Sequence, residues 1–152
     1  MKRVILPLLI LLFSSISLYG GTYKSVNEQL DKVLLDTLKR FHYVSDYVQY
    51  GRDKRVSFAK EVKEGKDFRG DCDDFAYTIR DILREKGHTV QTVIVRTSKL
   101  SGSLIHMVVK VDDMYMIDNR YPFVRLWENG VKGSQYKLLT KNYKWNNSYF
   151  YY

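Results

Sequence analysis

The chain has 152 residues, of which 45% are hydrophobic and 28% are charged, a balance typical of one globular domain rather than a disordered segment. Its single cysteine excludes a disulfide framework and a multi-cysteine zinc site within one chain. The formal net charge of +8 is most simply a solvated basic surface, and it would also suit anionic envelope polymers or an acidic protein partner. The dispersed basic residues and the lack of a nucleic-acid motif argue against nucleic acid as a partner.

Residues 1–21 predict a signal peptide or an uncleaved N-terminal anchor. Lys2 and Arg3 form a basic head, residues 4–13 are apolar, and small residues follow up to Gly20 and Gly21. The apolar run is shorter than the roughly 20 residues of a membrane span. We therefore expect a periplasmic or secreted protein whose domain covers residues 22–152, and which meets a membrane only through this segment if it is uncleaved. The alternative is a buried N-terminal helix.

The first half of the domain predicts helices. Apolar residues recur at three- and four-residue steps between Val26 and Tyr50, which favours one long helix. A short helix is expected over Val56–Val62, before Gly65. A third helix is expected from Cys72 to about Lys86, because Phe75, Ile79, Ile82 and Leu83 form an apolar stripe and Gly87 follows.

The second half predicts strands over Thr89–Thr97, Leu104–Val111 and Met114–Ile117. Residues 98–103 are expected to form a loop and Asp112-Asp113 a hairpin turn. The tail from Leu126 is expected to add one or two short strands. Helices followed by an antiparallel sheet indicate an α+β domain.

The stretch Gly70-Asp71-Cys72-Asp73-Asp74-Phe75-Ala76 places the only thiol in the first turn of a helix. Unpaired backbone N–H groups and the helix dipole stabilise a thiolate at this position, as a nucleophile requires. The alternative is a small buried cysteine that serves only packing.

A thiol nucleophile needs a base, and the base needs an orienting group. Among the three histidines, His42 is expected to pack beside aromatic residues and His88 to lie exposed in a turn. His106 lies inside an apolar strand, where an imidazole must find a polar partner. It is either a satisfied core histidine or the base of a triad with Cys72 and Asp118, which ends the next strand.

These residues resemble those of the bacterial transglutaminase-like cysteine peptidases. The resemblance runs from Gly70 to Asn119 and rests on the Gly-Asp-Cys motif, the His106-Met107-Val108 strand and the Met116-Ile117-Asp118-Asn119 segment. It implies a papain/transglutaminase-like fold in which N-terminal helices, including the cysteine helix, pack on an antiparallel sheet. It also implies Cys72 as nucleophile, His106 as general base and Asp118 as orienting acid. The best-known members are calcium-dependent periplasmic proteases that cut surface adhesins.

The strand register determines whether Asp118 or Asn119 can orient His106. If Asp112-Asp113 is a two-residue turn, His106 lies opposite Asn119 and Asp118 points to the other face. A three-residue loop or a bulge puts Asp118 on the face of His106. The residues alone leave both open; the family resemblance favours Asp118 and therefore an odd-length loop or bulge near Asp112.

The carboxylates beside Cys72 oppose its ionisation, because negative charges raise a thiol pKa. A protonated His106 would offset them. So would a calcium ion at Asp71 and Asp73, since calcium prefers oxygen ligands. The other interpretation is that Asp71, Asp73 and Asp74 only cap the helix. No other cofactor is expected.

We therefore expect an exported cysteine peptidase that cleaves a protein substrate, from the envelope or cell surface, through a Cys-His-Asp triad and a thioester. The alternatives are a non-catalytic envelope binding module on the same fold and an acyl-transfer enzyme, either a transglutaminase or an amidase.

Overall fold

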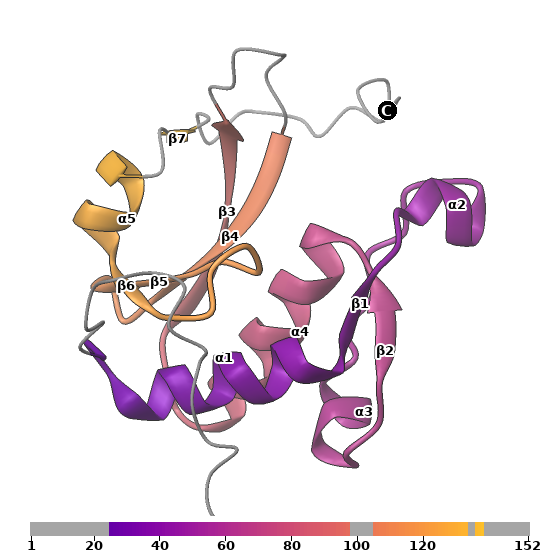
Figure 1. Ribbon diagram of the computed structural model, residues 1–152, viewed down its shortest axis with the longest axis horizontal. Helices are drawn as coiled ribbons and strands as arrows, with labels where there is room; N and C mark the ends of the chain where they lie inside the picture. Colours follow the sequence, from indigo (N-terminus) through magenta and orange to yellow (C-terminus); the bar gives the residue numbers. More distant parts are fainter. Residues whose placement is uncertain (1–24, 98–104, 134–135, 139–152) are drawn as a thin grey trace, which may run out of the picture.

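The computed structural model describes residues 25–97, 105–133 and 136–138 (Figure 1). The leader predicted over residues 1–21, the loop predicted over 98–103 and the tail beyond Leu138 lie outside these ranges. In the part of the chain that is described, no helix has the length and apolar character needed to cross a bilayer.

Helices dominate the first half of the chain. Helix α1, Glu28–Arg40, begins after Asn27, whose side chain accepts a hydrogen bond from the backbone N–H of Leu30. It packs against α3, Ala59–Lys63, and α4, Cys72–Glu85. The helix predicted from Cys72 to about Lys86 is thus confirmed within one residue.

The single helix predicted over Val26–Tyr50 is wrong in its second half. The chain becomes extended at β1, Phe41–Tyr43, which pairs in parallel with β2, Phe68–Gly70. The rings of Phe41 and Phe68 pack with centroids 5.4 Å apart. This long-range aromatic contact outweighs the helical periodicity. A separate short helix, α2, covers Asp46–Tyr50.

The second half forms a five-stranded antiparallel sheet in the order β6-β5-β4-β3-β7. Its strands are β3 (Val90–Thr97), β4 (Ile105–Val111), β5 (Tyr115–Ile117), β6 (Arg125–Leu126) and β7 (Tyr136–Leu138).

Two apolar layers cover the sheet. Helix α4 packs on β3 and β4, and its Phe75 and Ile79 share a core with Met107 and Val109. On the other face, Val108 and its neighbours on β3 and β5 pack against α5, Trp127–Gly133 (Figure 1). The alternation of Met107, Val108 and Val109 between the two cores is the two-residue period of a strand. The α+β prediction, with the cysteine helix on an antiparallel sheet, is confirmed.

The strands predicted in the tail exist as β6 and β7, but α5 between them was not expected. Its sequence contains Asn129, Gly130 and Gly133, which are poor helix formers. Trp127 and Val131, one helical turn apart, pack against the second core. Tertiary packing of this pair explains why the segment is helical.

Candidate active site

Cys72 is the first residue of α4 and is buried where α4 meets β4. Asp71 caps the helix, since its side chain accepts a hydrogen bond from the backbone N–H of Asp73 at 3.2 Å. Cys72 packs in the same core as Met107 of β4, and the backbone N–H of Met107 lowers the pKa of the Cys72 thiol. This contact brings the only cysteine beside the strand that carries His106.

The surroundings of Cys72 disfavour a thiolate. Burial is the largest cause that raises the pKa of the Cys72 thiol, and the negative charge of Asp71 comes next. The backbone N–H of Met107 acts in the opposite direction but does not balance them. These surroundings therefore favour the neutral thiol over the thiolate.

Gly70 allows α4 to fold back closely on β2. A Cβ atom at this position would lie 2.5 Å from Oδ2 of Asp74, closer than any real contact permits. The Asp74 side chain occupies that space, and its Oδ1 accepts a hydrogen bond from the backbone N–H of Val56 at 2.7 Å. The glycine of the Gly-Asp-Cys motif is thus required by close packing.

His106 and Asp118 are joined directly. Nε2 of His106 lies 2.9 Å from Oδ1 of Asp118, and both side chains are buried. The pairing leaves Nδ1 of the ring available to a second partner. A histidine held through Nε2 by a carboxylate has a fixed ring orientation and a preferred tautomer.

The β4–β5 loop decides which residue His106 meets. Val111 pairs with Tyr115, so Asp112, Asp113 and Met114 form a three-residue connection. The two aspartates have φ values of 49° and 57°, in the left-handed region. The predicted odd-length loop is confirmed, and it is Asp118 rather than Asn119 that contacts His106.

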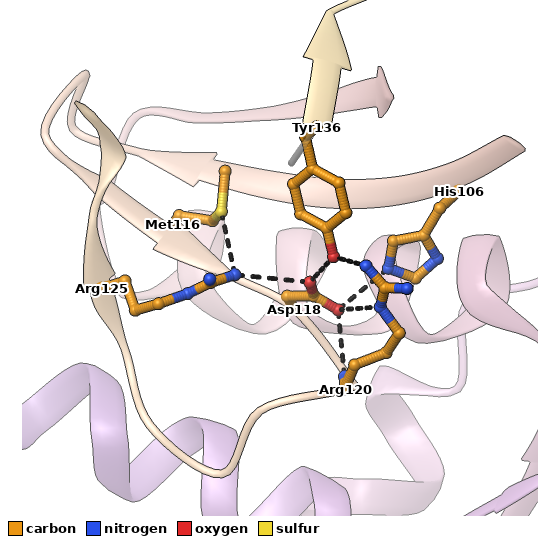
Figure 2. A network of polar contacts seen from close by, with 6 residues as sticks. All are labelled: His106, Met116, Asp118, Arg120, Arg125 and Tyr136. Carbon is orange, nitrogen blue, oxygen red and sulfur yellow. Dashed lines mark hydrogen bonds and ion pairs between the residues drawn. The ribbon is translucent and has the colours of Figure 1, made fainter. Parts of the chain in front are cut away.

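Asp118 has further partners, drawn in Figure 2. Oδ1 accepts a hydrogen bond from the backbone N–H of Arg120 at 3.0 Å. Oδ2 accepts one from the Tyr136 hydroxyl and lies 3.5 Å from the Arg125 guanidinium. Burial alone would raise the pKa of Asp118, but the hydrogen bond and charge of His106, followed by the backbone N–H and charge of Arg120, hold it below its usual range.

Arg120, Arg125 and Tyr136 were not expected from the sequence. Only Arg120 carried a usable indication, because it lies two residues after Asp118. The other two come from β6 and β7, whose places at opposite edges of the sheet depend on long-range pairing.

Four aspartates form an acidic cluster beside Cys72: Asp46, Asp71, Asp73 and Asp74. All four are buried, and one ligand oxygen from each lies within 4.8 Å of the others. The sequence had singled out Asp71 and Asp73 as candidate metal ligands. Asp46 was missed because it begins α2, inside the segment expected to continue the first helix.

Three of the four aspartates have a local structural role, and three have buried oxygens that accept no hydrogen bond from the described residues. Asp71 caps α4, and Asp46 and Asp74 accept backbone hydrogen bonds. Buried oxygens without a hydrogen-bond partner remain on Asp46, Asp73 and Asp74. Burial, with the neighbouring carboxylates, raises the pKa of Asp73 and of Asp74. Helix capping therefore explains only part of the arrangement.

The acidic cluster fits a calcium ion. Calcium takes oxygen ligands at about 2.3–2.6 Å, so ligands on opposite sides of an ion lie roughly 5 Å apart. The oxygens of the cluster lie within 4.8 Å of one another. Among the described residues, one cationic side chain forms an ion pair with the acidic cluster. It is Arg55, whose Nε lies 3.7 Å from Oδ2 of Asp73.

The other two histidines lie elsewhere. His42 is exposed on β1, 3.4 Å from Asp67, so its predicted packing role is wrong. Its side chain points to solvent because β1 pairs with β2. His88 is half-buried rather than exposed, and its Nδ1 lies 2.7 Å from Asp112.

A cysteine at the start of a helix, packed on an antiparallel sheet that carries a His–Asp pair, defines the class of papain- and transglutaminase-like folds. The sequence model of one family, described as bacterial transglutaminase-like cysteine proteinase BTLCP, matches residues 21–149. The chain belongs to this family. The match extends well beyond the segment 70–119 on which the resemblance in the sequence rested.

Among solved structures, the chain is similar to Legionella pneumophila LapG, with 20% identity and a TM-score of 0.50. The similarity covers 72% of this chain and 61% of the LapG chain, so the match spans about three fifths of LapG. It shows a shared fold. No curated protein matches the sequence.

Proposed function

We propose that the protein hydrolyses peptide bonds of a protein substrate, with Cys72 as nucleophile, His106 as general base and Asp118 as the residue that orients His106. The observation that carries the proposal is the His106–Asp118 pair, at 2.9 Å, whose histidine lies on β4, the strand that packs against the cysteine helix α4. Family membership supports the same assignment.

In the first half of the reaction, Sγ of Cys72 attacks the substrate carbonyl as His106 takes the thiol proton. The backbone N–H of Cys72, at the start of α4, helps to hold the oxyanion. When the C–N bond breaks, His106 returns the proton to the leaving amine. The product is a thioester on Cys72 and a released amine fragment.

In the second half, a water molecule replaces the amine. His106 accepts a proton from the water, the new C–O bond forms and the C–S bond breaks. The Cys72 sulfur leaves and recovers the proton from His106. Throughout, Asp118 keeps its negative charge and stabilises the imidazolium.

We further propose that the acidic cluster holds calcium, with Asp46, Asp71, Asp73 and Asp74 as ligands. Its unpartnered buried oxygens and its all-carboxylate donor set support this. A bound cation would supply positive charge that offsets the carboxylates and lowers the thiol pKa of Cys72. The ligand residues also set the position of the α4 N-terminus, because Asp71 is its cap.

The substrate and the location of the protein follow from the sequence as proposals. Residues 1–21 support export to the periplasm or beyond the cell, and therefore an envelope or cell-surface protein substrate. The net positive charge favours an acidic segment in that substrate. Tyr43 is exposed at the end of β1, beside Gly70 in the register, and offers an aromatic contact near Cys72.

The experiment is a search for new N-termini. The protein is incubated with calcium and an envelope protein extract, and new peptide N-termini are identified by mass spectrometry. We expect cleavage by the wild type, none by Cys72→Ala, and full cleavage by the control His88→Ala. His88 is a suitable control because it pairs with Asp112, away from the His106–Asp118 pair.

Three other outcomes would contradict the proposal. Equal cleavage by Cys72→Ala would remove Cys72 as the nucleophile. Incorporation of an added labelled amine into protein, without new N-termini, would identify an acyl-transfer enzyme instead. Binding without either reaction would favour the non-catalytic module.

A further inference from the structure

We propose that Tyr136 and Arg125 are positioning residues of the peptidase: they hold the Asp118 carboxylate in the orientation and charge state that fix the ring of His106, the proposed base. The inference rests on the proposed function, because it gives a role to side chains around that triad. Neither residue is one of the three that the reaction itself uses.

The two oxygens of Asp118 are divided between two sets of donors (Figure 2). Oδ1 accepts from Nε2 of His106 at 2.9 Å and from the backbone N–H of Arg120 at 3.0 Å. Oδ2 accepts from the Tyr136 hydroxyl and lies 3.5 Å from the Arg125 guanidinium. Donors on Oδ2 prevent the carboxylate from rotating away from His106.

Charge gives Arg125 a second effect. The Asp118 side chain has an exposed fraction of 0%, and an isolated buried carboxylate would favour its neutral form. The Arg125 side chain is 10% exposed, so its attraction to Asp118 is weakly screened. Asp118 therefore remains an acceptor for the His106 ring.

Arg125 is itself fixed by neighbours. Its guanidinium carbon lies 3.9 Å from the centroid of the Tyr121 ring, a cation–π contact. Its terminal nitrogen lies 3.3 Å from Sδ of Met116. These contacts give the guanidinium one direction, toward Asp118, as a positioning role requires.

Tyr136 reaches both members of the pair. Its ring centroid lies 6.0 Å from that of His106, and its hydroxyl donates to Asp118. The Arg120 guanidinium lies over the Tyr136 ring at 4.9 Å and contacts its hydroxyl. Tyr136 comes from β7, which pairs with β3, so the edge strand of the sheet supplies part of this site.

The charged and titratable groups that surround Asp118 and Cys72 fall into two sets. Asp118 faces His106 of β4, Arg120 after β5, Arg125 of β6 and Tyr136 of β7. Cys72 faces the acidic cluster and Tyr43. The ring of His106 is therefore the direct reporter of the first set.

The test compares four variants: Tyr136→Phe removes only the hydroxyl, Arg125→Met removes the charge, Arg125→Lys keeps it, and Tyr115→Phe is the control. Tyr115 is a half-buried tyrosine of β5 that is not a partner of Asp118. The readout is the pH titration of the His106 ring followed by NMR, since a purely structural role would leave its midpoint unchanged.

We expect the midpoint to rise in both test variants. Without the Arg125 cation, protonation of the nearby imidazole is less opposed, and the midpoint should rise by about half a pH unit or more. Tyr136→Phe should raise it less, because only a neutral donor is lost. Arg125→Lys should lie close to the wild type, and Tyr115→Phe should equal it.

A second readout is the rate of Cys72 labelling by iodoacetamide at pH 7 with calcium present, the condition in which we predict rapid labelling of the wild type. We expect Tyr136→Phe and Arg125→Met to lower it about tenfold, the effect of losing one hydrogen bond to a charged group. Thermal unfolding of each variant checks that it is folded. If Arg125→Met does not fold, Tyr136→Phe decides alone.

Failure of the positioning role and failure of the proposed function give different results. Folded variants with the wild-type His106 midpoint and labelling rate would overturn the positioning role while the triad stands. If His106→Ala labels as fast as the wild type, the proposed function fails, whatever Tyr136→Phe does to the His106 titration.

Discussion

Two groups of buried carboxylates lie in the same site, and they are opposite in character. Asp118 has donors on both of its oxygens, from side chains and backbone of four separate segments. In the acidic cluster, neither oxygen of Asp73 accepts a hydrogen bond from the described residues, and Asp46 and Asp74 each have one oxygen that accepts none from them. The structure lowers the pKa of Asp118 and raises the pKa of Asp73.

The difference teaches how burial can serve two purposes. A buried carboxylate with a full set of donors carries a permanent charge that orients its neighbour. Buried carboxylates that lack donors destabilise one another and are relieved by a proton or a cation. Asp118 is therefore suited to stay ionised, and the acidic cluster is suited to bind a proton or a cation.

The largest expected effect is that of Asp118→Asn. The variant leaves Arg125 buried without its carboxylate, so we expect the free energy of unfolding to fall by about 3 kcal/mol. Cys72 labelling at pH 7 should fall by about three orders of magnitude, because the His106 ring loses its fixed tautomer. Denaturant unfolding and iodoacetamide labelling measure the two effects. Asp67→Asn, an exposed carboxylate next to His42, is the matched control. An unchanged labelling rate would contradict the role of Asp118.

The pH dependence of stability tests whether Asp118, unlike the acidic cluster, is held ionised in the folded protein. Because the folded-state pKa of Asp118 is lowered, its stabilisation is fully present above the ordinary aspartate pKa of about 3.9 and is lost as the pH falls through the folded-state value. The stability gap between the wild type and Asp118→Asn should therefore close only below about pH 4. Unfolding free energies from pH 7 to pH 2 measure this. A gap that closes near neutral pH would show that Asp118 is not held ionised.

Gly70→Ala should be the next largest in effect. The added methyl group must displace the Asp74 side chain, and overpacking of this kind costs about 2 kcal/mol. It should also weaken any stabilisation by calcium, because Asp74 belongs to the acidic cluster. Gly51→Ala, where nothing lies within 4 Å of the new atom, gives the cost of backbone strain alone. Equal effects of the two variants, in stability and in calcium response, would contradict the close packing of Gly70 on Asp74.

Asp73→Asn should act with the opposite sign to Asp118→Asn. In chelator, replacement of a buried carboxyl whose pKa is raised by burial and by the neighbouring carboxylates should stabilise the fold by about 1 kcal/mol. At saturating calcium the order should reverse, because the wild type gains binding energy that the variant has partly lost. Melting temperatures with and without calcium test both halves. Destabilisation in chelator would show that Asp73 has partners other than a cation.

The smallest expected effect is that of Arg55→Gln. Arg55 is half-exposed, and its Nε lies 3.7 Å from Asp73, so its contribution should stay below about 1 kcal/mol. The loss should be visible in chelator and should vanish at saturating calcium, where the cation replaces the arginine charge. A loss of the same size in both conditions would place the effect outside the acidic cluster.

The residues nearest in sequence to Cys72 were the most predictable. The Gly-Asp-Cys stretch carries its own cap, its helix stripe and its first-turn carboxylates, so local rules were enough. Asp118 was predictable once the connection around Asp112 was taken as odd in length. Alternation alone left Asn119 equally open, because one residue of slip exchanges the two faces of a strand.

The residues missed are those whose places depend on distant pairing. Asp46 joins the acidic cluster only because the first helix ends before Phe41 and β1 pairs with β2. Tyr136 and Arg125 reach Asp118 from the two edge strands of the sheet. No local pattern distinguishes these residues from other polar or aromatic residues of the chain.

The most direct test of the central claim, that His106 activates Cys72, is the pH dependence of Cys72 labelling by iodoacetamide with and without calcium. Wild type and His106→Ala are compared side by side. We predict that the wild type with calcium labels rapidly below about pH 7, well under the ordinary thiol pKa of about 8.5, and that the variant does not. Slow labelling that follows ordinary thiol titration in both proteins and both conditions would contradict the account and favour a binding module.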